Sequence, residues 1–522
     1  MKRSIELNKV EENKRWEVIV IGGGATGLGV AIDAANRGFK TILLEAHDFA
    51  KGTSSRSTKL VHGGVRYLAQ GHIDLVREAL RERGLLAQNA AHLVESQSFV
   101  IPSYNWVDSF MYRIGLGLYD RFSGKLSLGD TEFISKDTTV KKLPTIKTDH
   151  LRNGVVYYDG QFDDARLAVN MAQTIVEQGG CVLNYAEVID LLEDENNKVI
   201  GVVFKDQLSG KTYEILSDVV INATGVFTNA ILQMDEKTDR KFVVPSQGIH
   251  LVLDRSFMPS EDALMIPKTS DGRVLFAVPW HDKLVVGTTD VLVEDASLEP
   301  EPLQREVDFI LQTAANYLTK KPTRTDVLSV FAGLRPLAAP EKEGQSTKEV
   351  SRSHKIIVSE SGLVTITGGK WTTFRQMAED TVNKALKVHG IAMRPCQTKH
   401  LSIHGNLPEN EVDRDELLSQ YGSDKPLVQA IQKESVETTE KIHPNYDYTV
   451  AEVIWAVREE MAITVEDVLA RRIRLLFLDA KAAIDCAPKV AEIMAKELDK
   501  DQIWIDHQVE TFIALAQNYL LH

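Results

Sequence analysis

The stretch WEVIVIGGGATGLGVAIDAANRGFKTILLEA, residues 16–46, determines which fold the rest of the chain can adopt. Its apolar pattern predicts a strand over residues 17–21, a glycine-rich turn, a helix over residues 25–37 and a second strand over residues 40–44. Strand, glycine turn, helix and strand in this order form the Rossmann unit of parallel α/β sheets. We therefore expect an α/β protein that binds a dinucleotide.

The three glycines of this turn each meet a separate requirement of dinucleotide binding. Gly22 permits the tight turn, Gly24 lets the backbone approach a pyrophosphate, and Gly27 lets the helix pack closely on the strand. Glu45 ends the second strand, where its carboxylate can accept hydrogen bonds from a ribose and would repel a 2′-phosphate. The turn therefore favours FAD or NAD over NADP.

The composition excludes several classes of protein. A chain of 522 residues is too long for one core, and its formal net charge of −14 argues against a nucleic-acid surface. Cys181, Cys396 and Cys486 lie far apart, without a CxxC or a histidine cluster, so we expect neither disulfides nor a metal site. The same cysteine pattern makes a reducing cytoplasm the simplest compartment. No stretch is long and apolar enough to span a bilayer, so any membrane contact is expected to be peripheral.

Further segments carry residues suited to a flavin or a phosphate. The stretch GTSSRSTKLVHGGVRYL, residues 52–68, combines hydroxyl groups with two glycines, although an ordinary capped turn is the alternative interpretation. Glycine turns follow apolar strands at residues 223–225 and 368–370. The candidate cofactor-binding residues in these segments are Thr53, Ser54, Ser55, His62, Gly63, Gly64, Thr224, Gly225, Gly369 and Lys370.

The later part of the chain predicts two more structural units. We expect residues 154–218 to return to the first sheet with a small β-meander attached, and residues 241–290 to form an antiparallel sheet that serves as the substrate platform. From about residue 395 the pattern becomes helical, and Thr464 is placed to cap a helix.

Residues 108–122 carry apolar side chains four apart, which predicts one apolar helical face. A buried core helix is the favoured interpretation, and an interfacial helix with arginines at lipid headgroups is the alternative. The residues concerned are Phe110, Ile114, Leu118 and Phe122, with Arg113 and Arg121 beside them.

Cationic residues and histidines indicate the chemistry of the substrate. Guanidinium groups bind phosphate or carboxylate in a bidentate way, although a single arginine is more often a surface residue. A histidine can take a hydroxyl proton near neutral pH while a hydride leaves the same carbon. GxSxG, HExxH and P-loop motifs are absent, so hydrolysis and phosphoryl transfer lack support. The candidates are Arg66, Arg335, Arg352 and Lys370 for an anion, and His62, His250 and His281 for a base.

The motifs as a set resemble those of the FAD-dependent, respiratory sn-glycerol-3-phosphate dehydrogenases. The similarity runs in order from about residue 16 to about residue 480. The motifs are IGGGATGLGVAIDAANRG, GTSSRSTKLVHGGVRYL, YYDGQFDDARL, VINATGVFTN, FAVPWHDKLVVGTTD, AGLRPL, TGGKWTTFR and TVEDVLARRIRLLFLD.

This resemblance implies noncovalently bound FAD and oxidation of glycerol 3-phosphate to dihydroxyacetone phosphate, with hydride transfer from C2 of the substrate to N5 of the flavin. It implies that Arg66, Tyr67, Arg335, Arg352 and Lys370 surround the substrate phosphate and the flavin, and that His250 lies near the flavin. The predicted catalytic residues are His250 and Arg335. We favour His250 as the base, because arginine holds its proton strongly.

The expected architecture is a Rossmann-like FAD-binding domain, an interleaved antiparallel-sheet substrate domain and a C-terminal α-helical domain. The acceptor implied by the resemblance is membrane quinone, with the protein in the cytoplasm, peripherally attached to the inner face of the cell membrane. A homodimer is also expected. The expected boundaries are residues 16–100, 150–235 and 355–390 for the FAD-binding domain, 101–149 and 236–354 for the substrate domain, and 395–522 for the helical domain.

Three alternatives stay open at this point. A glycerol-3-phosphate oxidase would share the dehydrogenation site and pass electrons to oxygen. An amine or amino-acid oxidase on the same fold would hold a carboxylate with fewer cations. A flavin-bearing redox sensor would have no use for the arginine, lysine and histidine set.

Overall fold

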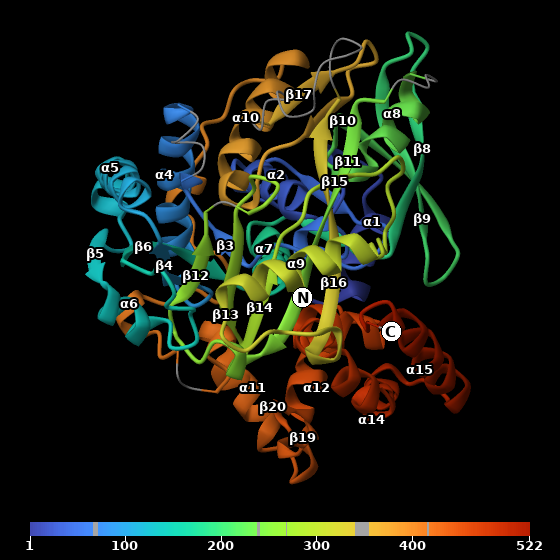
Figure 1. Cartoon of the computed structure of the whole chain (residues 1–522). Coiled ribbons are helices and arrows are strands. Elements are labelled where there is room, and N and C mark those ends of the chain that lie inside the picture. Colours follow the sequence, from blue (N-terminus) through green and yellow to red (C-terminus); the bar gives the residue numbers. More distant parts are fainter. Residues whose placement is uncertain (66–70, 237–240, 268, 340–353, 415–416, 522) are drawn as a thin grey trace.

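The computed structural model describes residues 1–65, 71–236, 241–267, 269–339, 354–414 and 417–521. Two large β-sheets carry helices on their faces, and a helical C-terminal part lies at the bottom of the view in Figure 1. The predicted fold class, a Rossmann-like α/β part combined with a second sheet and C-terminal helices, is confirmed.

The first sheet is built on the Rossmann unit. Its central strand β1 (Arg15–Ile21) is parallel to β2 (Thr41–Leu44) on one side and to β10 (Thr212–Asn222) on the other. Every residue of β2 is buried, as is typical of a parallel strand that is covered on both faces. The expected β-meander is present, because β8 (Ala186–Glu193) pairs with β9 (Val199–Asp206), which pairs with β10. The other strands of this sheet are β7 (Cys181–Leu183), β17 (Lys355–Val358) and β18 (Val364–Thr367).

Helices cover both faces of the first sheet. Alternate residues of β1 point to opposite faces, so Val18 and Val20 lie in one core while Ile19 and Ile21 lie in another. The first core is closed by α2 (Ala25–Asn36), α7 (Asp164–Glu177) and α10 (Phe374–Val388), and the second by α1 (Arg3–Glu12) and α8 (Thr228–Glu236).

The second sheet is mainly antiparallel, and its longest pairing joins β11 (Val243–Asp254) to β16 (Val327–Ala338). The expectation that residues 154–159 return to the first sheet is wrong, because β6 (Asn153–Phe162) pairs along its whole length with β4 (Val94–Ser103) in the second sheet. The other strands are β3 (Leu60–Val61), β5 (Glu132–Ser135), β12 (Ala263–Ile266), β13 (Leu275–Trp280), β14 (Lys283–Gly287) and β15 (Val291–Leu292).

Helices α6 (Lys136–Lys142) and α9 (Gln304–Tyr317) border one core of the second sheet, and α4 (Ile73–Asn89) and α5 (Trp106–Ser123) border another. The apolar stripe expected on the inward face of α5 is confirmed for Phe122, which packs against this core, and wrong for Phe110 and Leu118. The side chain of Ile114 lies outside the described part of the structure. Leu116 and Tyr119 face the core, whereas Phe110 is 58% and Leu118 is 42% exposed. Among the residues that the structure describes, no helix combines the length and apolarity needed to cross a bilayer.

The C-terminal part packs its own core against residues of the second sheet such as Val252 and Phe331. The predicted cap at Thr464 is confirmed, because its Oγ1 accepts a hydrogen bond of 3.2 Å from the Asp467 amide. The helices and strands here are α11 (Lys425–Gln432), β19 (Lys441–His443), β20 (Tyr446–Thr449), α12 (Val450–Glu459), a π-helix (Asp467–Arg472), α13 (Leu475–Leu478), α14 (Ala480–Leu498) and α15 (Gln502–Gln517).

A buried group of ion pairs joins this C-terminal part to the first sheet. Asp48, which follows β2, accepts hydrogen bonds from Arg471 at 2.5 Å and from Arg472 at 2.8 Å. Burial alone would raise the pKa of Asp48, but the two guanidinium groups outweigh it and hold that pKa well below its usual range. Asp164 at the start of α7 likewise accepts from Arg474 at 2.8 Å. These contacts fix the C-terminal helices next to the Rossmann unit.

Candidate active site

A cavity of about 930 Å³ lies at the carboxyl ends of the parallel strands, between the first and second sheets. The first sheet contributes the residues that follow β1, β2, β10 and β18, and the second sheet contributes residues of β11 and β16. Parallel α/β sheets bind ligands at this edge because the strand ends and the helix N-termini converge there. The cavity is therefore where the Rossmann unit would hold its dinucleotide.

The glycine turn brings backbone amides to the cavity. Gly22 has φ of +108°, a conformation that side chains disfavour, and a Cβ on Gly27 would lie 1.9 Å from the Gly22 carbonyl oxygen. Helix α2 can begin this close to β1 only with glycine at position 27. Its N-terminus meets the cavity at Gly24 and Ala25, and the helix dipole would stabilise an anion there.

Glu45 lines the cavity at the end of β2. Its Oε2 accepts a hydrogen bond of 2.5 Å from the Gly23 amide, and its Oε1 accepts one of 2.9 Å from the His47 amide. Burial raises the pKa of Glu45, and the two amides oppose that rise. The carboxylate thus ties the glycine turn to the next strand, at the place where the sequence predicts a ribose.

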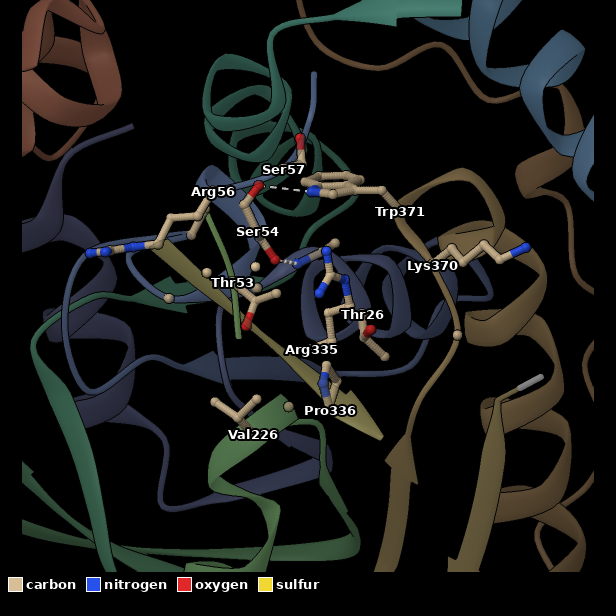
Figure 2. A pocket seen from close by; sticks show the side chains of 18 of the residues that line it. Thr26, Thr53, Ser54, Arg56, Ser57, Val226, Arg335, Pro336, Lys370 and Trp371 are labelled. Atoms are coloured by element: carbon tan, nitrogen blue, oxygen red, sulfur yellow. Dashed lines mark hydrogen bonds between the residues drawn. The ribbon is translucent and has the colours of Figure 1, made fainter. Parts of the chain in front are cut away.

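The hydroxyl loop contributes some of its predicted residues to the cavity and not others. Thr53, Ser54, His62 and Gly64 line it, and the Ser54 Oγ accepts a 2.9 Å hydrogen bond from the Ala25 amide. Figure 2 shows Ser54 beside Trp371, whose Nε1 donates to the Ser54 carbonyl at 2.8 Å.

Three of the predicted cofactor-binding residues do not line the cavity: Gly27, Ser55 and Gly63. The Gly63 amide donates to the buried Tyr119 hydroxyl at 2.8 Å, so it faces α5 and not the cavity. The Ser55 carbonyl accepts from Lys59 at 2.7 Å, and its side chain is buried. Among the other predicted residues, Gly22, Gly24, Glu45, Thr224, Gly225, Gly369 and Lys370 line the cavity.

His250 lies on β11, is 2% exposed and lines the cavity. Its Nε2 shares a 2.9 Å hydrogen bond with the Thr58 hydroxyl, and its ring stacks on Phe331 with 4.9 Å between centroids. Burial, together with the charges of Lys59 and Arg335, holds its pKa well below the ordinary value. The ring is therefore neutral near pH 7 and keeps a lone pair for a proton.

The other two histidine candidates differ from His250 in their surroundings. His62 lines the cavity, and burial lowers its pKa to about 4. His281 does not line the cavity; its Nε2 lies 3.6 Å from Asp163 at the start of α7. Of the three, His281 is the one that the structure separates from the site.

Arg335 and Lys370 both line the cavity, from β16 and from the turn after β18. Figure 2 shows their side chains pointing in different directions, so they meet different parts of the cavity. The Arg335 Nη2 donates to the Thr288 hydroxyl at 3.2 Å and to the Thr289 carbonyl at 3.1 Å. The predicted residues Arg66, Tyr67 and Arg352 lie outside the described residues.

Several cavity residues were not singled out from the sequence. Each lies in a motif that the sequence analysis quoted: Asp159 in YYDG, Thr288 and Thr289 in GTTD, Trp371 in GGKW. The missed signal is the clustering of polar residues at the ends of apolar strands, since strand ends meet at the cavity edge. Thr58, the partner of His250, lies in the hydroxyl loop and could have been included with its neighbours.

Comparison with known proteins agrees with this geometry. The family model described as FAD dependent oxidoreductase matches residues 17–375, and that of the C-terminal domain of alpha-glycerophosphate oxidase matches residues 363–503. The probable mitochondrial glycerol-3-phosphate dehydrogenase of Dictyostelium discoideum is 39% identical over 99% of this chain and 85% of its own length. The Caenorhabditis elegans counterpart is 40% identical over 94% of this chain and 72% of its own length. The chain belongs to the FAD-dependent glycerol-3-phosphate dehydrogenase family.

A solved structure from this family has the same architecture. The glycerol-3-phosphate dehydrogenase of Bacillus halodurans, complexed with FAD, superposes with a TM-score of 0.81 at 29% identity, covering 99% of this chain and 97% of that one. The family and the cofactor predicted from the sequence are thereby confirmed.

The residues of this chain fit FAD. The cavity extends without interruption from the glycine turn of the first sheet to β11 and β16 of the second, as a cofactor with a nucleotide and a flavin requires. Gly225 and Gly369 adopt φ of +60° and +75°, so the backbone can approach a flat ring closely at both turns. The nucleotide half would be held by Gly22, Gly24 and Glu45.

Replacing Gly27 with alanine should abolish tight binding of FAD. The new methyl group would collide with a backbone oxygen, which no side-chain rotation can relieve, and α2 would have to move away from β1. We expect purified Gly27→Ala protein to contain less than about a tenth of the wild-type flavin and to be destabilised by about 1–3 kcal/mol. The ratio of flavin to protein absorbance measures the first effect, and thermal unfolding the second.

Gly115→Ala is the matched control, since a Cβ at that position of α5 meets no atom within 4 Å. This variant should keep its flavin. Equal flavin content in all three proteins would contradict the role given to Gly27.

Proposed function

We propose that the protein oxidises sn-glycerol 3-phosphate to dihydroxyacetone phosphate and passes the electrons to a membrane quinone. The observation that carries this proposal is the single cavity in which the dinucleotide turn of the first sheet faces His250 and Arg335 of the second. The activity named for the relatives, over almost the whole length of this chain, supports the same substrate.

Substrate binding is assigned to the cationic residues of the cavity. Arg335 offers a planar pair of donors that suits a phosphate or an oxygen atom of the substrate, and each charge-assisted hydrogen bond contributes about 1.5–3 kcal/mol. Lys370 supplies a second positive charge at the turn after β18. Arg66, Tyr67 and Arg352 complete the proposed binding set. FAD, when bound, supplies the flavin ring that accepts the hydride from C2.

His250 is assigned to the proton on the C2 hydroxyl group. Its neutral ring is available at and above neutral pH, because burial keeps its pKa low. The Thr58 hydroxyl and the Phe331 ring hold the imidazole in one orientation. Arg335, close enough to lower the pKa of His250 electrostatically, would in turn stabilise negative charge on the substrate oxygen.

A quinone is proposed as the electron acceptor. One wall of the cavity is apolar and includes Phe99, Met265 and Phe276, which suits an uncharged ring. These side chains belong to the same core as Tyr119 of α5. The apolar wall and the exposed helix therefore lie on the same side of the second sheet, where a lipid-soluble acceptor could arrive.

Anaerobic mixing of the purified yellow protein with sn-glycerol 3-phosphate tests the substrate. We expect loss of flavin absorbance and formation of one dihydroxyacetone phosphate per flavin, because a two-electron oxidation reduces one flavin. Glycine and D-alanine serve as controls and should leave the flavin oxidised. Bleaching by the amino acids, or none by glycerol 3-phosphate, would contradict the proposed function.

Reoxidation of the reduced protein then tests the acceptor. A soluble quinone should restore the yellow colour faster than air does. Faster reoxidation by air would identify an oxidase instead.

Replacing His250 with asparagine tests the base. A positioned general base contributes about 10²–10⁴-fold, so flavin reduction in single-turnover mixing should slow by that factor. A base of ordinary histidine pKa would lose activity as the pH falls from 7 to 6. The rate of flavin reduction in the wild type should not show this loss, because the pKa of His250 lies well below the ordinary value. His281→Asn, away from the cavity, is the control and should react as the wild type does. An unchanged rate in His250→Asn would remove His250 from this role.

The outer face of α5 is proposed as the membrane contact. The protein would lie in the cytoplasm and bind the inner face of the cell membrane through this face. Phe110, Met111 and Leu118 are 58%, 62% and 42% exposed, and their spacing places them on one side of the helix. The exposed Arg77 and Arg121 flank this face, and the Arg77 guanidinium lies 4.7 Å from the Phe122 ring centre. Apolar side chains with flanking arginines are typical of interfacial helices. The expected homodimer stays a prediction.

Replacing Phe110, Met111 and Leu118 together with serine should weaken binding to vesicles that contain anionic lipid. Burying one large apolar side chain contributes up to about 1.5–3 kcal/mol, so the partition coefficient should fall by at least about tenfold. Co-sedimentation with vesicles measures it, and the rate of flavin reduction in solution should not change. Ile503→Ser is the control, since Ile503 is 78% exposed on α15, away from α5. An equal loss in the control, or none in the triple variant, would exclude this face.

A further inference from the structure

Arg335 is held in position by the segment that follows β14. Its guanidinium group is held by Thr288 and by the Thr289 carbonyl, and its Nη1 lies 3.5 Å from Asp290. These three residues form the turn that follows β14. Whatever orients the turn therefore also orients the side chain to which substrate binding is assigned.

A buried carboxylate outside the cavity holds this segment in place. Glu306, in the first turn of α9, is 2% exposed and does not line the cavity. Its Oε1 accepts a hydrogen bond of 2.5 Å from the Thr289 hydroxyl. The Thr289 Oγ1 accepts in addition a 2.9 Å bond from the Ile249 amide of β11. The hydroxyl is thus used both as donor and as acceptor, which leaves Thr289 one orientation.

The second oxygen of Glu306 is also engaged. Its Oε2 accepts from the Gln247 side-chain amide at 2.7 Å and from the Leu303 backbone amide at 3.1 Å. Gln247 is 4% exposed and lies on β11, next to Ser246, which pairs with Arg335 in the sheet. Three donors therefore converge on one buried carboxylate, and two of them come from segments next to Arg335.

We propose that Glu306 is a positioning residue for Arg335: its carboxylate fixes Thr289, and the Thr289 carbonyl with Thr288 fixes the guanidinium group that binds the substrate. This inference rests on the proposed function, because that function gives Arg335 a substrate to bind. A carboxylate accepts from all three donors. The amide oxygen of glutamine could accept from Gln247 and Leu303, but the bond to Thr289 would have to reverse, with the hydroxyl accepting where it now donates.

Glu306→Gln should therefore weaken substrate binding more than it slows the chemical step. Misplacing a substrate-binding group by about 1 Å can cost on the order of 100-fold in rate. In anaerobic stopped-flow reduction with sn-glycerol 3-phosphate, we expect the apparent Kd to rise about tenfold or more, with a smaller change in the limiting rate.

Glu452→Gln is the matched control. Glu452 is also 2% exposed and also in the first turn of its helix, where it accepts a 2.7 Å hydrogen bond from the Thr449 amide, but it lies in the C-terminal part. Both variants should lose stability, whereas only Glu306→Gln should change the apparent Kd. A change of equal size in the control would show a general structural effect and overturn the inference.

A double-mutant comparison tests whether Glu306 affects substrate binding through Arg335 or independently of it. If Glu306 acts through Arg335, adding Glu306→Gln to Arg335→Gln should not raise the apparent Kd further. Additive effects would overturn the proposal. If Glu306→Gln does not fold, Thr289→Val and Thr289→Ser replace it, and the valine variant, which lacks the hydroxyl, should raise the apparent Kd more than the serine variant.

Anaerobic flavin reduction distinguishes a failure of the proposed function from a failure of the role given to Glu306. Failure of glycerol 3-phosphate to reduce the wild-type flavin contradicts the proposed function. Normal reduction of the wild type together with an unchanged apparent Kd in Glu306→Gln contradicts this inference alone.

Discussion

The close packing of α2 on β1 is the constraint on which the active site depends. Because Gly27 lies directly against the Gly22 carbonyl, the helix starts within reach of the strand end and its first amides meet the cavity. The ends of β2 and β10 lie at the same edge because both strands are parallel to β1. Glu45 and Gly225 therefore reach the same cavity as the first amides of α2.

The second sheet supplies the reactive groups that the first sheet lacks. Parallel strands covered on both faces are apolar, so their contribution to the site consists largely of backbone amides. The long pairing of β11 with β16 instead places His250 and Arg335 on one rigid surface opposite those amides. Side chains on paired strands keep their positions better than side chains on loops, which suits a reaction that needs the substrate and the cofactor in fixed contact.

Local patterns in the sequence predicted the parts of the fold that depend on neighbouring residues. The Rossmann unit, the meander and the cap at Thr464 all follow from spacing within a short stretch. The sheet that contains β6 and the outward face of α5 could not be predicted, because each depends on partners far away in the chain. The site shows the same division: the glycines and Glu45 carry a local signature, whereas Thr58 and Glu306 matter only through tertiary contacts. The domain boundaries and the roles of single residues stay predictions.

The buried ion pairs at the C-terminal part limit the order in which the protein can be assembled during synthesis. Asp48 and Arg472 are separated by 424 residues, and Asp164 and Arg474 by 310 residues. Asp164 also pairs with Lys59 at 2.7 Å, which is made before it, but both arginine partners of Asp48 are made long after it. A carboxylate without a partner resists burial. The segment around Asp48 is therefore expected to stay hydrated until Arg471 and Arg472 emerge. The end of β2, where Asp48 lies, is thus expected to reach its final packing only once the C-terminal part is present.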